Sequence, residues 1–431
     1  MAASVTKGRG NIPRWVYSVL PVSLASGPLS TLIQIHLIDL NGPTLGVIYA
    51  GLAVSAFNGV SIPAAMFWGY ATDWLHSRRS LIVASYFFEG LVLLLLLPLG
   101  STGGTMLVYS LFAFISTASA TPLNLLIMES EPKSSWAGAF ARLSMMSGVG
   151  NVAGLILSTV WAQQLPIVML SIPLGNLAVV SAGIALLTIP SPDVVLERET
   201  IARRQSSFFN RLLSLPMFFL NIPRLSDFRR IFRGLRYELT SYVPLFYIST
   251  VLFYFSSGVF NTSFVPSLSH FSLSAGEIFA VILVGMVVQT LAFQYAGGYI
   301  ARRSLVATSI QGLLLRGACY VVFGISALVL TGSTFLLPSL VLYPLGAGVA
   351  FVAYYTSSNT MMFNTVQGRS PGSALGVYSA VVGFATLAGS LASGFISVYA
   401  GFHITFILAG IILLAAAGVV ARLPGKGEQT S

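Results

Sequence analysis

Long apolar runs dominate this chain and restrict what it can fold into. Runs of about 18 or more apolar residues are candidates for membrane spans, and several occur here, at 15–38, 80–99, 239–265, 304–330 and 402–421. Only 22 Lys and Arg and 12 Asp and Glu residues stand among 431, whereas soluble proteins are about one quarter charged. So few charges cannot cover a surface that faces water. The sequence therefore predicts an all-α polytopic membrane protein.

Twelve spans account for both the apolar segments and the positions of the basic residues. We predict them at 15–39, 44–71, 80–99, 105–129, 142–163, 166–189, 239–265, 276–300, 304–330, 334–361, 372–398 and 402–421. With both chain ends on one side, 21 of the 22 Lys and Arg residues fall on that side, and the exception, Arg316, lies inside a span. Because Lys and Arg are enriched in cytoplasmic loops, we expect both termini in the cytoplasm and the protein in the cell (plasma) membrane.

The longest polar interval divides the spans six and six. We predict an N-terminal six-helix bundle at 1–190, a cytoplasmic central loop at 191–236 and a C-terminal six-helix bundle at 237–431. Within the loop, SDFRRIFRGLR (226–236) places apolar residues on one helical face and arginines on the others. This pattern is typical of a helix on anionic inner-leaflet headgroups and equally of a connector helix packed beneath the protein. We do not expect nucleic-acid binding.

Several motifs recur at a shift of six spans. GYATDWLHSRRSLIVAS (69–85) follows the second span, and a shorter echo, GYIARRSLVATS (298–309), follows the eighth. GVGNVAG (148–154) in the fifth span and GFATLAG (383–389) in the eleventh share glycines six residues apart. The two halves are therefore predicted to be parallel pseudo-repeats.

Together these features resemble the major facilitator superfamily, whose loop between the second and third spans reads roughly G-x-L-A-D-R-x-G-R-R. Gly69, Asp73, Arg78 and Arg79 match the glycine, acid and basic positions, while Trp74 and His76 replace an arginine and a glycine. The second copy lacks the acid and keeps three positions: Gly298, Arg302 and Arg303. The resemblance implies a secondary transporter that works as a monomer and alternates between inward-open and outward-open states as its halves rock.

The resemblance also implies a latch on the cytoplasmic side. In this family the loop acid is thought to lie near the start of the eleventh helix in the outward-facing state. Here SPGSALG offers Ser370 as N-cap and Pro371 as the first helical residue. A carboxylate beside a helix N-terminus gains roughly 0.3–2 kcal/mol, so Asp73 could hold the halves together. The alternative is that Asp73 and the arginines only fix topology and bind headgroups.

Polar residues near mid-depth of the spans are candidates for a solute cavity, because polar groups in hydrocarbon are costly and normally face protein or water. The resemblance places spans one, four, seven and ten around that cavity. Our candidates are Ser26, Asn58, Thr117, Thr121, Asn124, Asn151, Tyr254, Ser257, Asn261, Gln289, Tyr343, Tyr354 and Asn359. Hydroxyls, amides and aromatic rings suit neutral or amphiphilic organic solutes. The same groups also join transmembrane helices, which is the alternative interpretation.

Two charges lie deep in apolar runs. Glu89 and Arg316 lie roughly 14 and 18 Å along the third and ninth spans at 1.5 Å per residue. Such a group is by default a functional candidate, and Glu89 could carry a coupling proton. Because these spans usually support the cavity in the family, both charges could instead be structural. Asp39, at the outer end of the first span, is the second proton candidate, with loop solvation as its alternative explanation.

We therefore predict a secondary active transporter for a small organic solute, with proton coupling as an option. A drug exporter is the alternative, although GVGNVAGLIL lacks the proline and paired glycines of that group's fifth-span signature. A solute sensor and a lipid-modifying enzyme are weaker alternatives. The four histidines lack metal-ligand spacing and no phosphate-binding glycine loop occurs, so we expect no enzyme, cofactor or metal. Substrate, direction of transport and coupling ion are left open.

Overall fold

The structure is a computed structural model that describes residues 13–75, 78–130, 136–189, 242–301, 303–366 and 371–423. Every regular element in these ranges is a helix, which confirms the all-α prediction. The first part contains η1 (Arg14–Ser18), α1 (Val19–Ser26), α2 (Leu29–Leu75), α3 (Arg78–Leu94), α4 (Thr102–Ser130), α5 (Trp136–Trp161), η3 (Ile167–Leu170) and α6 (Ser171–Thr188). The second part contains α11 (Tyr242–His270), α12 (Ala275–Ala301), α13 (Leu305–Val329), η6 (Gly332–Phe335), α14 (Leu336–Tyr343), η7 (Pro344–Ala350), α15 (Phe351–Val366), α16 (Pro371–Tyr399) and α17 (Phe402–Val420).

Twelve membrane crossings follow from these helices. Within the described ranges, ten helical stretches are long and apolar enough to cross a membrane, and the first of them runs from Arg14 to Gly69. Gly42, with a φ of 76°, interrupts α2 in a conformation that favours glycine, so this stretch makes two crossings. The apolar helix α3 supplies the remaining crossing with 17 residues. The predicted number of spans is confirmed in the described part of the chain.

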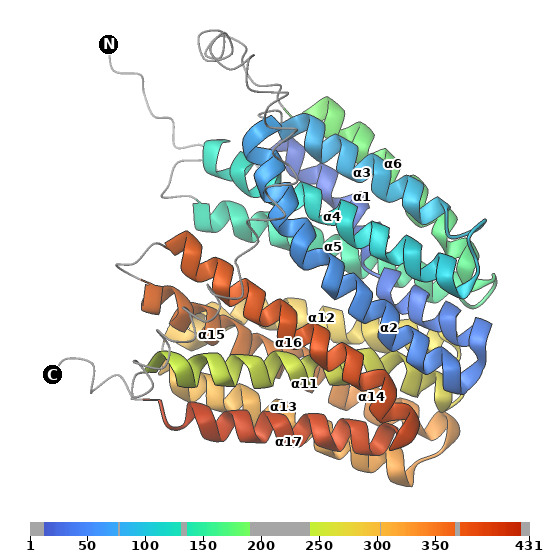
Figure 1. The fold of residues 1–431 in the computed structure, drawn as a ribbon, viewed down its shortest axis with the longest axis vertical. Helices are drawn as coiled ribbons and strands as arrows, with labels where there is room; N and C mark the ends of the chain where they lie inside the picture. Colours follow the sequence, from blue (N-terminus) through green and yellow to red (C-terminus); the bar gives the residue numbers. More distant parts are fainter. Residues whose placement is uncertain are drawn as a thin grey trace, which may run out of the picture.

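The crossings form two bundles that lie side by side, with α1–α6 in one and α11–α17 in the other (Figure 1). In the first bundle α3 packs on α6, α1 on α5 and α2 on α4. In the second, α13 packs on α17, α11 on α16, and α12 on η7 and α15. These are the same pairs of spans shifted by six, as a duplicated chain requires. The loop 191–236 and its amphipathic segment lie outside the described residues, so the domain boundaries stay a prediction.

The loops gather at two ends of the molecule. Arg79 Nη2 donates to the carbonyl of Leu186, which brings the start of α3 to the end of α6. We call this the basic end. At the opposite end, the His270 ring lies 5.2 Å from Phe402, joining the end of α11 to the start of α17. Loops therefore alternate between the ends, as they must in a chain that crosses repeatedly.

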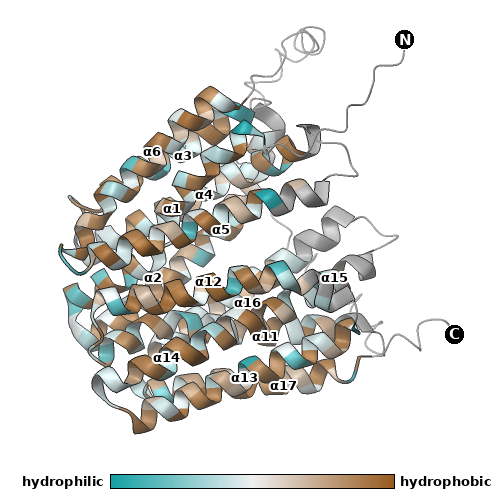
Figure 2. Cartoon of the chain, turned by 180° about the vertical axis from the view of Figure 1, so that it is seen from behind, coloured by the Kyte–Doolittle hydropathy of each residue, from teal (hydrophilic) through white to brown (hydrophobic). Residues whose placement is uncertain are grey.

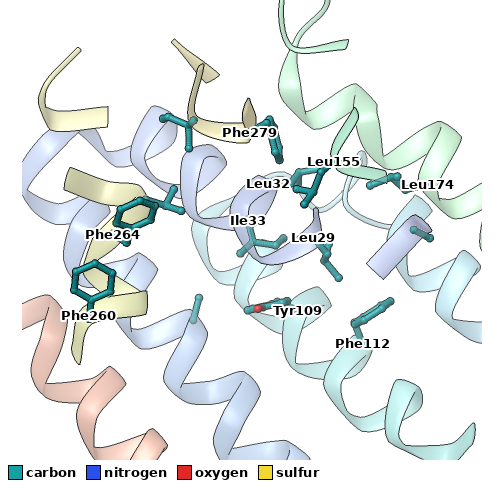
Figure 3. Packing of buried hydrophobic residues seen from close by; sticks show 14 of the residues in the cluster. Leu29, Leu32, Ile33, Tyr109, Phe112, Leu155, Leu174, Phe260, Phe264 and Phe279 are labelled. Carbon is teal, nitrogen blue, oxygen red and sulfur yellow. The ribbon is translucent and has the colours of Figure 1, made fainter. Parts of the chain in front are cut away.

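Apolar side chains fill the interior and also cover the perimeter. One buried cluster runs through both bundles and includes Leu155 and Leu174 of the first and Phe260 and Phe264 of the second (Figure 3). Hydrophobic residues are distributed along the visible faces of the labelled helices wherever these are coloured by hydropathy (Figure 2). Many large apolar side chains are exposed, among them Leu187. A surface of this kind is stable in lipid and not in water.

The tenth span differs from the single regular helix that we predicted. It consists of α14, a π-helical segment from Pro344 to Ala350, and α15. Pro344 has no N–H and therefore cannot close the helical hydrogen bond at its own position. Widened turns of this type occur often at functional sites.

Candidate functional site

The two bundles meet where α2 packs on α16 and α11, and where α5 packs on α12. Asn58 Nδ2, a cavity candidate, donates to Ser390 Oγ of α16 at 3.3 Å. Nearer the opposite end, Gly51 faces Gly394 so closely that a methyl group added at Gly51 would lie 3.1 Å from the Gly394 Cα atom. The lack of side chains at both glycines permits this approach of the two helix backbones.

The repeated glycine motifs take equivalent positions in this arrangement. A methyl group at Gly148, which begins the first motif, would meet Thr290 of the other bundle at 3.8 Å, and one at Gly383, which begins the second, would meet Ile62 of the other bundle at 2.8 Å. The last glycine of each motif packs inside its own bundle, Gly154 on Leu24 and Gly389 on Phe255. In each motif the first glycine therefore lies at the contact between the two bundles. The last glycine lies at a contact between two helices of its own bundle.

These contacts lie from the middle of the helices toward the opposite end. Gly69 lies nearer the basic end of α2. A methyl group added there would have no atom within 4 Å apart from those of its chain neighbours and the adjoining helix backbone. Among the described residues, these contacts between the bundles lie at the middle of the helices and toward the opposite end, and Gly69 has open space beside it.

The described basic residues of the loop motifs serve local contacts. Arg79 satisfies a carbonyl at the C-terminal end of α6, which a cation also stabilises through the helix dipole. Arg303 lies over the Tyr299 ring at 4.7 Å and its Nη1 donates to Gln311 at 3.4 Å. Arg78 is half-buried and has interaction partners. Ser370 and Arg302 lie outside the described residues, as do the side chain of Asp73 and the surroundings of Gly298. The latch therefore stays a prediction, although α16 does begin at Pro371.

Among the cavity candidates of the first bundle, Ser26, Thr117, Thr121 and Asn151 are half-buried and Asn124 is exposed. Ser26 and Thr117 donate to carbonyls of their own helices, at 3.4 Å to Ser23 and 2.8 Å to Phe114. Asn151 adjoins Gly27 of α1, where an added methyl group would lie 2.9 Å from its Cα atom. These contacts fit the helix-joining interpretation for Asn151 and leave Thr121 and Asn124 as the more available groups.

In the second bundle, Tyr254, Gln289, Tyr343 and Asn359 are half-buried, Asn261 is exposed, and Ser257 and Tyr354 are buried. The hydroxyl of Ser257 donates to the backbone carbonyl of Phe253, and the side-chain amide of Asn359 donates to the backbone carbonyl of Tyr355. The rings of Tyr354 and Phe253 stack at 3.9 Å, and those of Tyr343 and Phe264 at 4.1 Å. The tyrosines thus belong to an aromatic wall between α11, α15 and the turn at η7.

The deep charges lie on equivalent helices of the two bundles. Glu89 lies on α3, eight residues after Leu81, and Arg316 lies on α13, eleven residues after Leu305, the equivalent leucine of the repeated motif. Glu89 is 2% exposed, and its Oε1 accepts a hydrogen bond from Ser85 at 2.9 Å. Ser85 is also 2.9 Å from the carbonyl of Ile115 in α4. Asp39, the other proton candidate, is exposed.

Sequence reasoning missed the three rings that surround Arg316. Phe253, Tyr320 and Phe351 come from three separate helices and place their centroids 4.8, 5.2 and 5.2 Å from the guanidinium carbon. Only Tyr320, four residues after Arg316 on the same helix, could have been proposed from spacing.

Comparisons with known proteins agree with this architecture. The family model described as Major Facilitator Superfamily matches residues 18–366. The nucleoside transporter NupG is similar with 15% identity and a TM-score of 0.68, covering 95% of this chain and 98% of its own. The inward-open xylose transporter XylE from E. coli has 13% identity and a TM-score of 0.63, covering 97% of this chain and 96% of its own. A peptide transporter, POT, in complex with alafosfalin has 11% identity and a TM-score of 0.68, covering 99% of this chain and 97% of its own.

No curated protein matches the sequence significantly. The structural likenesses, all at low identity, show the fold. The family match extends over most of the chain and names a group of transporters rather than enzymes. The chain is a multi-pass membrane protein that belongs to the Major Facilitator Superfamily.

Proposed function

We propose that this protein is a secondary active transporter that carries a small polar organic solute by alternating access. The observation that carries the proposal is the contact between the bundles, which is tight from Asn58 to Gly51 on α2, from the middle of that helix toward the opposite end. Two bundles that touch toward one end can rock so that this contact opens while the basic end closes, which exposes a central site to either side in turn. NupG, XylE and POT, similar in fold, are named for nucleosides, xylose and peptides, which supports a polar organic solute.

The orientation belongs to the same proposal. The basic end carries Arg79 and Arg303, and nearly all other Lys and Arg residues of the sequence fall on its side. We place this end in the cytoplasm of the plasma membrane, with both termini inside, next to anionic headgroups. We take the described conformation to be inward-open, because the contacts named between the bundles lie from the middle of the helices toward the opposite end. The protein acts as a monomer, since each bundle finds its complement in the same chain.

Solute flux tests the proposal directly. The purified protein is reconstituted into liposomes and offered radiolabelled uridine, xylose and dialanine, with and without an inward proton gradient. We expect uptake of at least one solute above that of empty liposomes. Binding without flux would support a solute sensor instead, and chemical conversion of a solute would support an enzyme.

Asp73→Asn should shift the conformational equilibrium toward the inward-open state. The asparagine removes a carboxylate that we place beside the N-terminus of α16 when the basic end closes. Loss of about 0.3–2 kcal/mol raises the ratio of inward-open to outward-open protein about two- to thirtyfold. Distances between spin labels at Leu187 and Arg422, both exposed at the basic end, measure this ratio.

Glu277→Gln is the matched control for Asp73→Asn. Glu277 accepts hydrogen bonds from the backbone N–H and the hydroxyl of Ser274 at the start of α12, and glutamine can replace glutamate in such a capping box. We expect no change in the distances. An unchanged distribution in Asp73→Asn as well would leave the acid with a topological role only.

A further inference from the structure

The guanidinium of Arg316 is a buried cation in the middle of the membrane. The residue is 1% exposed and lies about 16 Å along α13 at 1.5 Å per residue. Arginine stays protonated in proteins, so its charge cannot be removed by losing a proton. The fold therefore has to supply compensation at this depth.

Aromatic rings supply part of that compensation. Phe253, Tyr320 and Phe351 surround the guanidinium at 4.8–5.2 Å, within the range of cation–π attraction. The Nε atom donates to the Tyr320 hydroxyl at 2.7 Å. A second layer supports these rings, with Tyr354 stacked on Phe253 and Phe260 on Tyr320. We call Phe253, Tyr320 and Phe351 the cage.

The remaining charge has no anionic partner among the described residues of this bundle. Nη1 of Arg316 is buried and has no hydrogen-bond partner in the described part of the chain. From residue 242 to residue 423 the sequence contains one acidic residue, Glu277, which is held by Ser274 at the start of α12. Glu89, the buried acid of the other bundle, accepts from Ser85. A buried cation without a counter-charge is costly, and aromatic faces cannot accept from a guanidinium N–H as strongly as a carboxylate does.

We propose that Arg316 and the cage form an anion site and that the solute carries a carboxylate. This inference rests on the proposed transport function and narrows its substrate to organic acids. The planar guanidinium matches a carboxylate in a two-point contact, and the water-poor surroundings strengthen the pair. The ring faces of the cage accept the apolar or aromatic part of the same molecule.

The cage has a structural means of opening. Phe351 is the first residue after the π-helical segment Pro344–Ala350, whose hydrogen bonding departs from the regular helix. A small change in this segment moves Phe351 relative to α13. Tyr254 and Asn261 lie on the same helix as Phe253, and they are half-buried and exposed, respectively. A solute can therefore reach Arg316 when Phe351 moves aside.

Matched pairs of acids and neutral analogues test the site. The full-length protein is exposed to benzoate and benzamide, glucuronate and glucose, and orotate and uracil. Thermal stabilisation measures binding, and flux into liposomes measures transport. We expect the acids, and not their neutral partners, to stabilise the wild-type protein. In Arg316→Gln their apparent affinity should fall about ten- to hundredfold, the range for a lost charge-assisted hydrogen bond.

Three further variants separate charge from folding. Arg316→Lys keeps the charge without the planar fork and should retain an intermediate affinity. Phe351→Leu keeps the arginine and opens the cage, so it should weaken benzoate more than glucuronate. Arg422→Gln removes an exposed positive charge of the same bundle and should leave acid binding unchanged.

Binding and flux test the anion site and the transport function separately. Acid binding that depends on Arg316 without flux supports the anion site and contradicts the transport function. If the neutral analogues are transported and the corresponding acids are not, the result contradicts the anion site and leaves the transport function in place. Equal acid affinity in wild type and Arg316→Gln also overturns the inference, as does the absence of acid stabilisation in the wild type.

Discussion

Glu89→Gln is expected to abolish solute accumulation driven by a proton gradient while leaving downhill exchange in place. Glu89 is a candidate from the sequence for the residue that carries a coupling proton, and we propose that role for it, since it is a buried acid at mid-depth whose described partner is the hydroxyl of Ser85. Glutamine has the same shape and can still accept from Ser85, but it cannot carry a proton. A one-unit pH gradient is worth about 1.4 kcal/mol for each proton, or about tenfold accumulation of a neutral solute. In the variant, the ratio of the solute concentration inside the liposomes to that outside should be about one.

Accumulation and counterflow in the same liposomes distinguish loss of coupling from loss of folding. A variant that exchanges solute at the wild-type rate is folded, so its failure to accumulate is specific. Glu277→Gln, which changes an acid at the start of α12, should accumulate like the wild type. If Glu89→Gln still concentrated solute against its gradient, Glu89 would be a structural acid, and Asp39 would be the next residue to replace.

Gly394→Leu is expected to drive the bundles apart at the opposite end. An added methyl group at Gly394 would already lie 3.3 Å from the carbonyl of Val47 and 3.5 Å from the Gly51 Cα atom. Overpacking costs about 1–3 kcal/mol, and outward opening relieves it. The ratio of outward-open to inward-open protein should rise about tenfold or more, and transport should slow because the return step becomes unfavourable.

Spin labels at Leu45 and Tyr399 measure this opening, because both side chains are exposed, at 54% and 81%. Gly394→Ala should give a smaller shift, since the neighbours need move by only a few tenths of an ångström. Gly418→Leu is the matched control, because an added methyl group there meets no atom within 4 Å. Equal distances in Gly394→Leu and Gly418→Leu would show that the glycine contact does not set the equilibrium.

The spans were predictable because lipid imposes strong rules on sequence. Apolar length and the one-sided distribution of Lys and Arg located crossings that the structure places within a few residues. The π-helical turn at Pro344 was not predictable from the pattern, since the surrounding residues are apolar and compatible with a regular helix. A proline in a span predicts a disturbance but not its form.

The candidate site was less predictable because its contacts join distant parts of the chain. The sequence identified Asn58 as a mid-depth amide and a cavity candidate, but nothing in the sequence indicates its partner Ser390, 332 residues away. The glycine motifs suggested duplication, yet only the structure shows that their first glycines face the other bundle. Likewise, Phe253 and Phe351 resemble any other apolar residue of a span until folding places them around Arg316.

Reversible cross-linking of the bundle contact tests alternating access most directly. With Cys319 replaced by alanine, Asn58 and Ser390 are changed to cysteine and joined by a short bis-methanethiosulfonate reagent, at the point where the native side chains touch. We predict that transport falls to the level of empty liposomes when the two helices are joined, that reduction restores it, and that neither single cysteine responds in this way. Undiminished transport by the cross-linked protein would contradict the account.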